Sequence, residues 1–473
     1  MLRLTDTRTR QLADIVPATP GVLTVYACGP TVYRFGHVGN VRTYLLSDLI
    51  YRVAERHGLR MRLVQNITDV GHLQDEVADA GEDKMAAAAR REGRSAFDLA
   101  RFYEDAFHRD LAALNVRPAQ AYPRASECIE LMLALIERLV ALGHAYPAPD
   151  GSVFFDARSF PSYGALSGNR LDQLRAGSGH AGEGLDANRY KRFHADWALW
   201  KGAGPATAMV WDSPWGPGFP GWHVECSAMS LRFLGEVFDI HTGGIDLRFP
   251  HHEDERAQSN AAVGHEVVRY WVHGEHLLNE GRKMAKSTGN VVLVSDLVAA
   301  GHDPLALRLF FLSGRYRQQL NLTADALTAA DRTLTRWRTK VAEWAESPSA
   351  PMAMAYVERV VAAFDDDLDT PTALVALREL ERDEAVPPGA KFETFAHLDA
   401  LFGLDVARDV GRQRPVVVLP AGAAGLLDAR AAARSAKEWA ESDRLRDALA
   451  AVGVAVTDTR EGQTWSLAAP AAR

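Results

Sequence analysis

The chain has 473 residues, 47% of them hydrophobic, so it can bury more than one core, and its length predicts two to four domains. It contains no apolar stretch long enough to cross a membrane and no secretion signal, so we expect a cytoplasmic protein without a membrane partner. Three cysteines are too few for a disulfide framework, in accord with a reducing compartment. The formal net charge of -8 gives no overall basic signal for nucleic acid, although it does not exclude an RNA bound at a local basic surface.

Two stretches of the sequence alternate strand and helix as a parallel sheet requires. Residues 22–27 form a short apolar run, apolar side chains recur at helical spacing over residues 45–53, and residues 59–64 alternate as a second strand. Residues 237–241 predict a further strand, followed by a glycine-bearing loop and a helix from about 252 to 263. The predicted fold class is α/β, with a Rossmann-like parallel sheet that binds ligands at its carboxyl edge.

We place these stretches in one domain, residues 1–322, with an insertion at about 115–200. Within the insertion, residues 126–142 predict a helix, Asp150-Gly151 predicts a hairpin turn, and residues 176–184 predict a glycine-rich loop. The insertion separates the two halves of the predicted sheet.

Residues 323–410 have the composition of a helical bundle. Helices are predicted over residues 324–346, 352–364 and 371–381, and Asp365-Asp366-Asp367 is interpreted as a solvated helix end.

Residues 411–473 predict a small mixed module. A linker over residues 415–425 precedes a helix over residues 429–452 and two short strands that flank Arg460-Glu461-Gly462.

Four side chains in the first domain have the chemistry of a metal site. His251 and Glu255 are four residues apart and share one helix face, and His252 competes with His251 for the same role. Cys28 follows the first strand, and Cys226 lies shortly before the strand at residues 237–241. If these strands adjoin, two thiolates, an imidazole and a carboxylate complete a tetrahedral site, whereas the alternative is a pair of buried, small apolar cysteines and a surface His–Glu pair.

Two further segments carry groups that suit phosphate. His37-Val38-Gly39-Asn40 stands where the first strand passes into its helix, so backbone N–H groups and the helix dipole can receive an anion there. Lys283-Met284-Ala285-Lys286-Ser287 places two lysines on a glycine-bounded loop, where they can stabilise the charge of a triphosphate. A solvated surface loop is the alternative for the second segment.

Taken in order, these segments resemble the class I aminoacyl-tRNA synthetases, and among them the cysteinyl-tRNA synthetases. The segment Cys28 to Tyr33, leading into His37 to Asn40, resembles the first family signature, and Lys283 to Ser287 resembles the second, K-M-S-K-S. The most specific resemblance lies in the segments Gly221 to Met229 and Phe249 to Glu253. The match extends over nearly the whole chain, and it implies a class I synthetase catalytic domain with an insertion, then a helical bundle and a small mixed C-terminal module.

The resemblance also implies roles for the individual domains and residues. The region at about 265–322 would contact the tRNA stem, the bundle would bind tRNA, and residues 411–473 would bind the anticodon. By the same resemblance, the zinc ligands would be Cys28, Cys226, His251 and Glu255, and the amino acid would be bound by Cys28, Gly29, Thr31, Thr68 and Trp222. ATP would be bound by His37, Gly39, Asn40, Lys283 and Lys286. Of these, the catalytic groups would be His37, Asn40, Lys283 and Lys286.

Two positions depart from the family pattern. Asn40 stands where the commonest signature has a second histidine, and Ala285 replaces the first serine of K-M-S-K-S. Asparagine still donates a hydrogen bond but carries no charge, so we expect a weaker or differently placed phosphate contact.

The implied reaction activates L-cysteine with ATP and transfers it to tRNA(Cys). Zinc would distinguish the cysteine thiol from the serine hydroxyl, because a soft thiolate is a far better zinc ligand. Mg²⁺ is expected with ATP, and a monomer is the family expectation. The alternatives are an ATP-dependent ligase that joins cysteine to a small amine, and a weakly active or non-catalytic paralogue.

Overall fold

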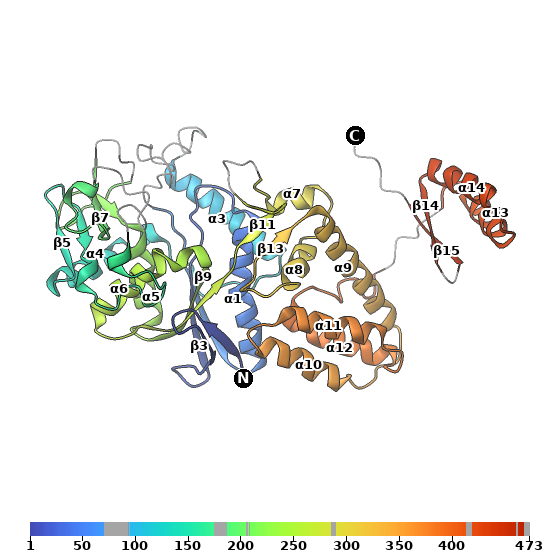
Figure 1. The fold of residues 1–473 in the computed structure, drawn as a ribbon, viewed down its shortest axis with the longest axis horizontal. Helices are drawn as coiled ribbons and strands as arrows, with labels where there is room; N and C mark the ends of the chain where they lie inside the picture. The colour runs from blue at the N-terminus through green and yellow to red at the C-terminus, as the bar shows by residue number, and fades with distance from the viewer. Residues whose placement is uncertain are drawn as a thin grey trace. The chain divides into compact units, whose positions relative to one another are not determined.

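A four-stranded parallel sheet forms the centre of the N-terminal half in the computed structural model (Figure 1). The structure describes residues 1–70, 93, 95–174, 187–204, 207, 209–284, 290–412, 419–459 and 462–467. The strand order is β10-β9-β3-β4, and all neighbours are parallel. The strands and their connecting helices are β3 (Val22–Ala27), α1 (Val38–Arg56), β4 (Arg60–Gln65), β9 (Phe238–Gly244), α6 (His251–Val263) and β10 (Val268–Gly274), which confirms the predicted α/β fold.

The helix α1 begins at a well-formed cap. His37 is its N-cap residue, and its ring accepts a hydrogen bond from the backbone N–H of Asn40, while the Asn40 side chain accepts one from the His37 N–H. Such reciprocal bonds satisfy donors that a helix end otherwise leaves unpaired. After Arg56 the chain turns at Gly58, whose φ of +71° favours glycine, and enters β4.

The insertion forms a second, antiparallel sheet of order β5-β6-β7-β8. The predicted helix over residues 126–142 is present as α4, preceded by a short 3₁₀ turn at Ala125–Glu127, and the hairpin turn at Asp150-Gly151 joins β5 to β6. The predicted glycine-rich loop lies outside the described residues. The elements of this region are α3 (Ala96–Ala113), α4 (Ile129–Ala141), β5 (Ala145–Pro147), β6 (Val153–Phe155), β7 (Trp197–Gly202), β8 (Gly218–Pro220) and α5 (Trp222–Leu234).

Two smaller sheets complete the first part of the chain. An N-terminal hairpin pairs β1 (Arg3–Asp6) with β2 (Gln11–Asp14). A three-stranded sheet of order β12-β11-β13 follows the parallel sheet in the chain. Its strands and the helices near them are β11 (Leu277–Asn279), β12 (Arg282–Lys283), α7 (Val294–Ala299), α8 (Pro304–Leu312) and β13 (Leu320–Leu322).

The predicted bundle contains one more helix than the sequence pattern indicated. Three of its helices match the predicted ranges, and the fourth, α12, was missed because it begins within the Pro-Pro-Gly segment at residues 387–389 and its apolar residues do not repeat on one face. The four helices are α9 (Ala324–Trp344), α10 (Met354–Asp365), α11 (Thr370–Arg382) and α12 (Pro388–Phe402).

The aspartate run marks a helix end as predicted, since α10 ends at Asp365, but the expectation that the whole run is solvated was wrong. Asp367 is 3% exposed, and its carboxylate accepts hydrogen bonds from the Thr5 backbone, the Tyr316 hydroxyl and the Arg317 guanidinium. Asp365 binds the N-terminal amine and His57. The run therefore joins the bundle to the N-terminal hairpin and to the loop before β13.

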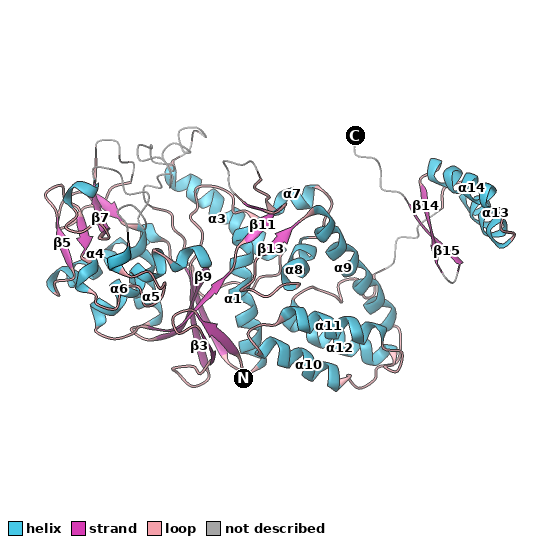
Figure 2. Ribbon diagram, in the orientation of Figure 1, coloured by secondary structure: helices cyan, strands magenta, loops and turns pink. Residues whose placement is uncertain are grey.

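The chain divides into two compact units, residues 1–410 and residues 411–473. The second unit contains α13 (Ala423–Ser435), α14 (Trp439–Ala451), β14 (Val454–Thr459) and β15 (Gly462–Leu467), and Figure 2 shows its mixed secondary structure. The two predicted strands are confirmed, but the single predicted helix over residues 429–452 is broken at Lys437, whose φ is +61°. Among the described helices, none is both long enough and apolar enough to span a bilayer.

Candidate active site

The carboxyl ends of β3 and β9 lie side by side. These strands pair in parallel through Tyr26 with His241 and Ala27 with Thr242, so Cys28 emerges next to the end of β9. The backbone N–H of Cys28 donates to the carbonyl of Thr242 at 3.1 Å. The predicted metal site required that the strands preceding Cys28 and following Cys226 adjoin, and β3 and β9 do so.

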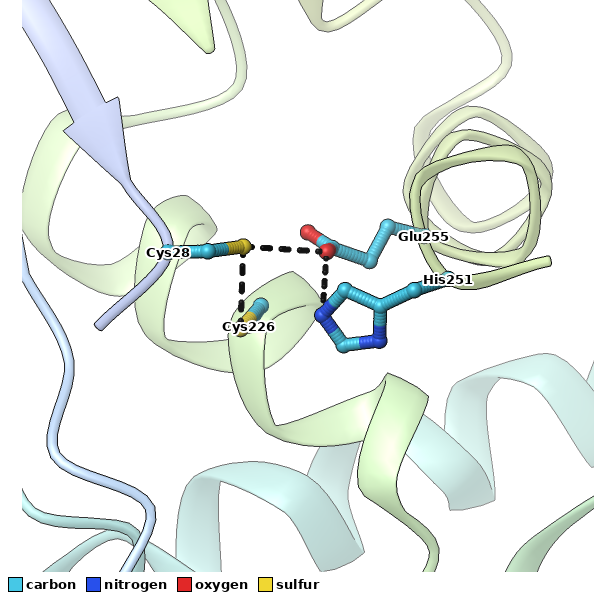
Figure 3. A group of neighbouring side chains, drawn as sticks. All are labelled: Cys28, Cys226, His251 and Glu255. Atoms are coloured by element: carbon cyan, nitrogen blue, oxygen red, sulfur yellow. Dashed lines mark hydrogen bonds and ion pairs between the residues drawn. The ribbon is translucent and has the colours of Figure 1, made fainter. Parts of the chain in front are cut away.

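Three elements bring four potential metal ligands to this edge (Figure 3). Cys28 follows β3, Cys226 lies on α5, and His251 and Glu255 lie one turn apart on α6. One ligand atom from each of the four lies within 4.8 Å of the others, and all four residues are buried. The two sulfur atoms are 4.0 Å apart, and His251 Nε2 lies 2.9 Å from Glu255 Oε1. This donor set is the one zinc accepts in proteins.

A second group of potential ligands overlaps the first. It shares Cys28 and Glu255 but takes His241 and His252 in place of Cys226 and His251. His252 Nε2 lies 3.2 Å from the Cys28 sulfur, and His241 Nε2 lies 2.9 Å from Glu255 Oε2. The competition that the sequence predicted between the two neighbouring histidines is therefore present in the structure.

His251 is oriented by contacts outside the four ligands. Its Nδ1 lies 2.8 Å from Nδ1 of His223, and His223 Nε2 in turn lies 3.5 Å from the Asp254 carboxylate. The Trp222 ring stacks on the His251 ring with centroids 4.1 Å apart and is 41% exposed. Such outer contacts fix the ring orientation and tautomer of a ligating histidine.

The pKa values of the four side chains shift in different directions, and burial raises the pKa of the Cys28 thiol well above its ordinary value. Burial opposes ionisation of Cys226, but the hydrogen bond from Cys28 and the nearby His251 lower its pKa to about 6. Burial likewise opposes ionisation of Glu255, but His241 and His251 lower its pKa to about 2. Burial opposes protonation of His251, but Glu255 and Cys226 raise its pKa to about 10, so an imidazolium balances these two anions. A metal ion bound by the neutral ring would take over that charge balance.

Three of the predicted amino acid contacts, Gly29, Thr31 and Thr68, lie on the two chain segments that follow β3 and β4. Thr31 and Thr68 bridge the two chain segments, and the Thr68 hydroxyl donates to the Glu225 carboxylate at 2.8 Å. Gly29 donates its N–H to Asn66 Oδ1, and a Cβ at Gly29 would lie 1.6 Å from the Asn66 carbonyl oxygen. Only glycine permits this close approach of the two segments.

The N-terminus of α1 presents the proposed phosphate ligands. Because His37 Nδ1 accepts from the Asn40 N–H, the neutral ring carries its proton on Nε2. Burial, together with Arg34, lowers the pKa of His37, so the ring is neutral at pH 7. A Cβ at Gly39 would lie 2.9 Å from His37 Nδ1, so glycine leaves room for this ring.

The two lysines of the second segment are only partly within the described structure. The backbone of Lys283 pairs with Leu278 in the β11–β12 hairpin, and Lys286 lies outside the described residues. The described part of the site therefore includes the backbone of Lys283 but neither lysine side chain.

Several residues of the site were missed by sequence reasoning. His241 lies beneath Glu255, stacked on Trp271 with centroids 4.7 Å apart, and Asp246 acts electrostatically on His37 from the turn after β9. The glycine pair before Asp246 was a usable signal, because a Cβ at Gly244 would lie 2.4 Å from the Asp246 carboxylate. His241 had no signal, since a histidine in a buried strand has many structural uses.

Comparison with known proteins gives consistent relatives. Residues 14–332 match the family of tRNA synthetases class I (C) catalytic domain, and residues 417–465 match the cysteinyl-tRNA ligase anticodon binding domain. Cysteine–tRNA ligase of Thermus thermophilus is 44% identical over 481 residues, which cover 98% of this chain and 98% of that protein. Cysteine–tRNA ligase 1 of Burkholderia lata is 43% identical over 469 residues, covering 98% of this chain and 96% of the relative.

Solved structures resemble this chain in fold. The ternary complex of Agrobacterium radiobacter K84 agnB2 LeuRS with tRNA and LeuAMS has a TM-score of 0.58 at 13% identity, covering 83% of this chain and 84% of that one. Mycobacterium tuberculosis methionyl-tRNA synthetase in complex with methionyl-adenylate has a TM-score of 0.56 at 16% identity, covering 82% of this chain and 92% of that one. At such identities the likeness concerns the fold alone.

Proposed function

Because this chain belongs to the cysteine–tRNA ligase family of class I aminoacyl-tRNA synthetases, we propose that it selects cysteine with a zinc ion while it charges tRNA(Cys) at the cost of ATP. The observation that carries the zinc proposal is the buried cluster of two cysteines, a histidine and a glutamate within 4.8 Å of one another. Cys28, Cys226, His251 and Glu255 are the proposed ligands.

The cluster with both cysteines suits zinc better than the overlapping one. Zinc is a borderline-soft ion, and two thiolates bind it more strongly than the single thiolate of the Cys28, His241 and His252 group. In addition, His241 already holds Glu255 through its second carboxylate oxygen, the role of an outer residue that orients a ligand.

When bound, zinc supplies a soft Lewis acid that accepts a thiolate in preference to a hydroxyl. The chain's own residues then limit what can approach it. Gly29 lets the segments after β3 and β4 approach closely beside Cys28, Thr68 joins the second of these segments to Glu225 on α5, and Trp222 stacks on the His251 ring. These contacts favour a small amino acid.

The activation step joins the cysteine carboxylate to the α-phosphate of ATP. A new carboxylate oxygen–phosphorus bond forms, the bond between the α-phosphorus and the oxygen that bridges it to the β-phosphorus breaks, and pyrophosphate leaves. Mg²⁺, when bound with ATP, would neutralise part of the phosphate charge. His37 donates from Nε2 to a phosphate oxygen, and Asn40 donates from Nδ2, because its Oδ1 is held by the His37 N–H. Lys283 and Lys286 stabilise the charge of the leaving group.

The transfer step passes cysteine from the adenylate to the terminal adenosine of the tRNA. The bundle and the second unit would hold the RNA. In the second unit, Trp439 and Trp465 are 57% and 37% exposed, and the Arg434 guanidinium lies 5.8 Å from the Trp439 ring centroid. Exposed aromatic rings beside cations are suited to unpaired bases. Arg430 is buried and donates through its guanidinium to both carboxylate oxygens of Asp458, so it is an internal residue of this unit.

Two assays test this proposal. The purified protein should catalyse cysteine-dependent exchange of pyrophosphate into ATP and should then charge tRNA(Cys). Exchange without charging would favour the ligase that joins cysteine to a small amine. Absence of exchange would contradict both enzymatic functions and favour a non-catalytic paralogue.

A further inference from the structure

Arg42 lies on α1, about one turn past the helix N-terminus, and is 7% exposed. Its guanidinium donates only to backbone carbonyl oxygens in the hydrogen bonds that the described structure contains. Nη1 donates to Glu275 and His276 at 2.9 and 2.8 Å, and Nη2 donates to Arg315 and Gln318 at 3.1 and 2.6 Å. Four carbonyl dipoles thus converge on one buried charge.

The four carbonyls belong to two connections that enter neighbouring strands. Glu275 and His276 join β10 to β11, and the Arg315–Gln318 loop leads from α8 into β13. β11 and β13 pair in parallel, and on its other side β11 pairs with β12 through Leu278 and Lys283. Arg42 therefore holds the starts of the strands that position the backbone of Lys283.

The segment at residues 290–292 is hydrogen-bonded both to the N-terminal end of α1 and to β11. The N–H of Val38 donates to the Val292 carbonyl at 3.0 Å, and Asn279 Nδ2 donates to the Asn290 carbonyl at 3.0 Å. Consequently the chain on either side of residues 285–289 is anchored to α1 or β11. These hydrogen bonds therefore set the distance between His37 and the β11–β12 hairpin, which includes Lys283.

We propose that Arg42 is a positioning residue for adenylate formation, which fixes the hairpin carrying Lys283 against the helix end carrying His37. This inference rests on the function proposed above. Lysine cannot replace arginine here, because its ammonium group has three donors on a flexible stem, whereas the planar guanidinium can reach four fixed carbonyls. Burial, partly offset by the Glu275 carboxylate, lowers the pKa of Arg42 to about 10, so the group remains charged at neutral pH.

A matched control is available on the same helix. Arg52 is 5% exposed, donates to the carbonyls of Ala400 and Asn115, and also binds Asp48. Its contacts face the bundle side of α1 and none of them reaches the β11 hairpin. Arg52→Lys therefore perturbs the packing of α1 without disturbing the proposed connection.

The experiment compares Arg42→Lys, Arg42→Ala and Arg52→Lys with the wild-type protein in cysteine-dependent ATP–pyrophosphate exchange. In Arg42→Lys we expect a KM for ATP raised about tenfold and a kcat lowered about tenfold, with unchanged zinc content and KM for cysteine. Arg52→Lys should lower the unfolding midpoint but leave both ATP constants of the folded enzyme unchanged.

Chemical rescue adds a readout that a merely structural role would not move. A cavity of about 20 Å³ adjoins Arg42, and Arg42→Ala would enlarge it enough for a guanidinium ion. Added guanidinium should then restore part of the exchange rate of Arg42→Ala. The exchange rate of Arg52→Lys should not rise when guanidinium is added. Wild-type KM and kcat values in Arg42→Lys would overturn this inference but not the proposed function. The same holds if the activity of Arg42→Lys falls only in proportion to its folded fraction. Absence of exchange in the wild-type protein would overturn the proposed function as well.

Discussion

At the residue scale, Gly29 shows how closely the two chain segments beside Cys28 approach. A methyl group there would meet the Asn66 carbonyl oxygen at 1.6 Å, so the backbone must move. We expect Gly29→Ala to destabilise the protein by about 3 kcal/mol and to lower its zinc content, because Cys28 is the adjacent residue. Gly204→Ala is the control, since its Cβ would lie 3.9 Å from the nearest atom. Thermal unfolding of both variants measures the difference, and equal midpoints would contradict the steric argument.

Asn40 combines two roles that substitution can separate. Its Oδ1 caps α1 through the His37 N–H, and its Nδ2 is the proposed phosphate donor. Asn40→Asp keeps the capping oxygen but puts a negative charge beside the phosphates, so we expect stability within about 0.5 kcal/mol of the wild type and a KM for ATP raised about tenfold. Asn40→Ala should lose about 1 kcal/mol of stability through the lost cap. Normal ATP kinetics in Asn40→Asp would show that Asn40 is a cap only.

The residue types of the metal cluster were predictable, but its outer contacts were not. A histidine and a glutamate four apart on one helix face, with cysteines near two strands, made a metal site one of two alternatives, and the family resemblance specified its four ligands. The stacking of Trp222 on His251 and the contact of His241 with Glu255 depend on how three elements cross. Side chains brought together only by packing leave no regular spacing in the sequence.

At the element scale, a buried ion cluster joins α1 to α8 and to the bundle. Asp48 on α1 accepts from Arg52 at 2.8 Å and from Arg308 at 2.5 Å, and these side chains are at most 5% exposed. Arg308 also donates to the Phe402 carbonyl at the end of α12. The Asp48 carboxylate thus binds two buried cations directly where three helices meet, and the Asp399 carboxylate on α12 acts on both of them electrostatically.

Removing that carboxylate should be costly. We expect Asp48→Asn to lower the free energy of unfolding by about 3–5 kcal/mol, because two buried guanidinium groups lose the carboxylate that binds them directly and keep only the electrostatic effect of Asp399. The exposed pair of Arg170 and Asp172 supplies the control, and Asp172→Asn should change stability by less than about 0.5 kcal/mol. A small effect of Asp48→Asn in urea unfolding would mean that the carbonyl contacts alone hold the junction.

The same substitution has a pH signature. Burial opposes ionisation of Asp48, but Arg308 and Arg52 lower its pKa below the ordinary value. Because the pKa is lower in the folded state, ionised Asp48 stabilises that state fully at pH values above the unfolded pKa of about 3.9. This stabilisation is lost as the pH falls below that value toward the folded pKa. The stability difference between the wild type and Asp48→Asn should therefore be full at neutral pH and shrink below about pH 4.

Elements with a regular pattern were predictable, and elements set by junctions were not. The strands at residues 22–27 and 237–241 were evident from their apolar runs. The backbone at Lys437, between α13 and α14, is in the left-handed region, which glycine usually occupies. Because the residue is a lysine, the sequence pattern did not predict the break. The aspartates at residues 365–367 resembled a polar helix end, and only the folded chain supplies the partners that bury Asp367.

At the scale of the whole molecule, the two units have separate cores. The main core extends from Leu2 to Val406, and the second unit has its own small core of Ala423, Leu427, Leu449 and Val454. A protein ending at Val410 should therefore fold, bind zinc and retain cysteine-dependent exchange. Charging of tRNA(Cys) should fall about 100-fold or more, because the anticodon-binding unit is lost. Unchanged charging by the shortened protein would contradict the RNA-binding role of the second unit.

The central claim is that Cys28, Cys226, His251 and Glu255 hold the zinc ion that selects cysteine. Metal analysis of Cys226→Ala and His252→Ala, combined with exchange assays on cysteine and serine, tests it most directly. We predict that Cys226→Ala loses zinc and its preference for cysteine, whereas His252→Ala retains stoichiometric zinc. Full zinc content with an unchanged preference in Cys226→Ala, or loss of zinc in His252→Ala alone, would contradict the account.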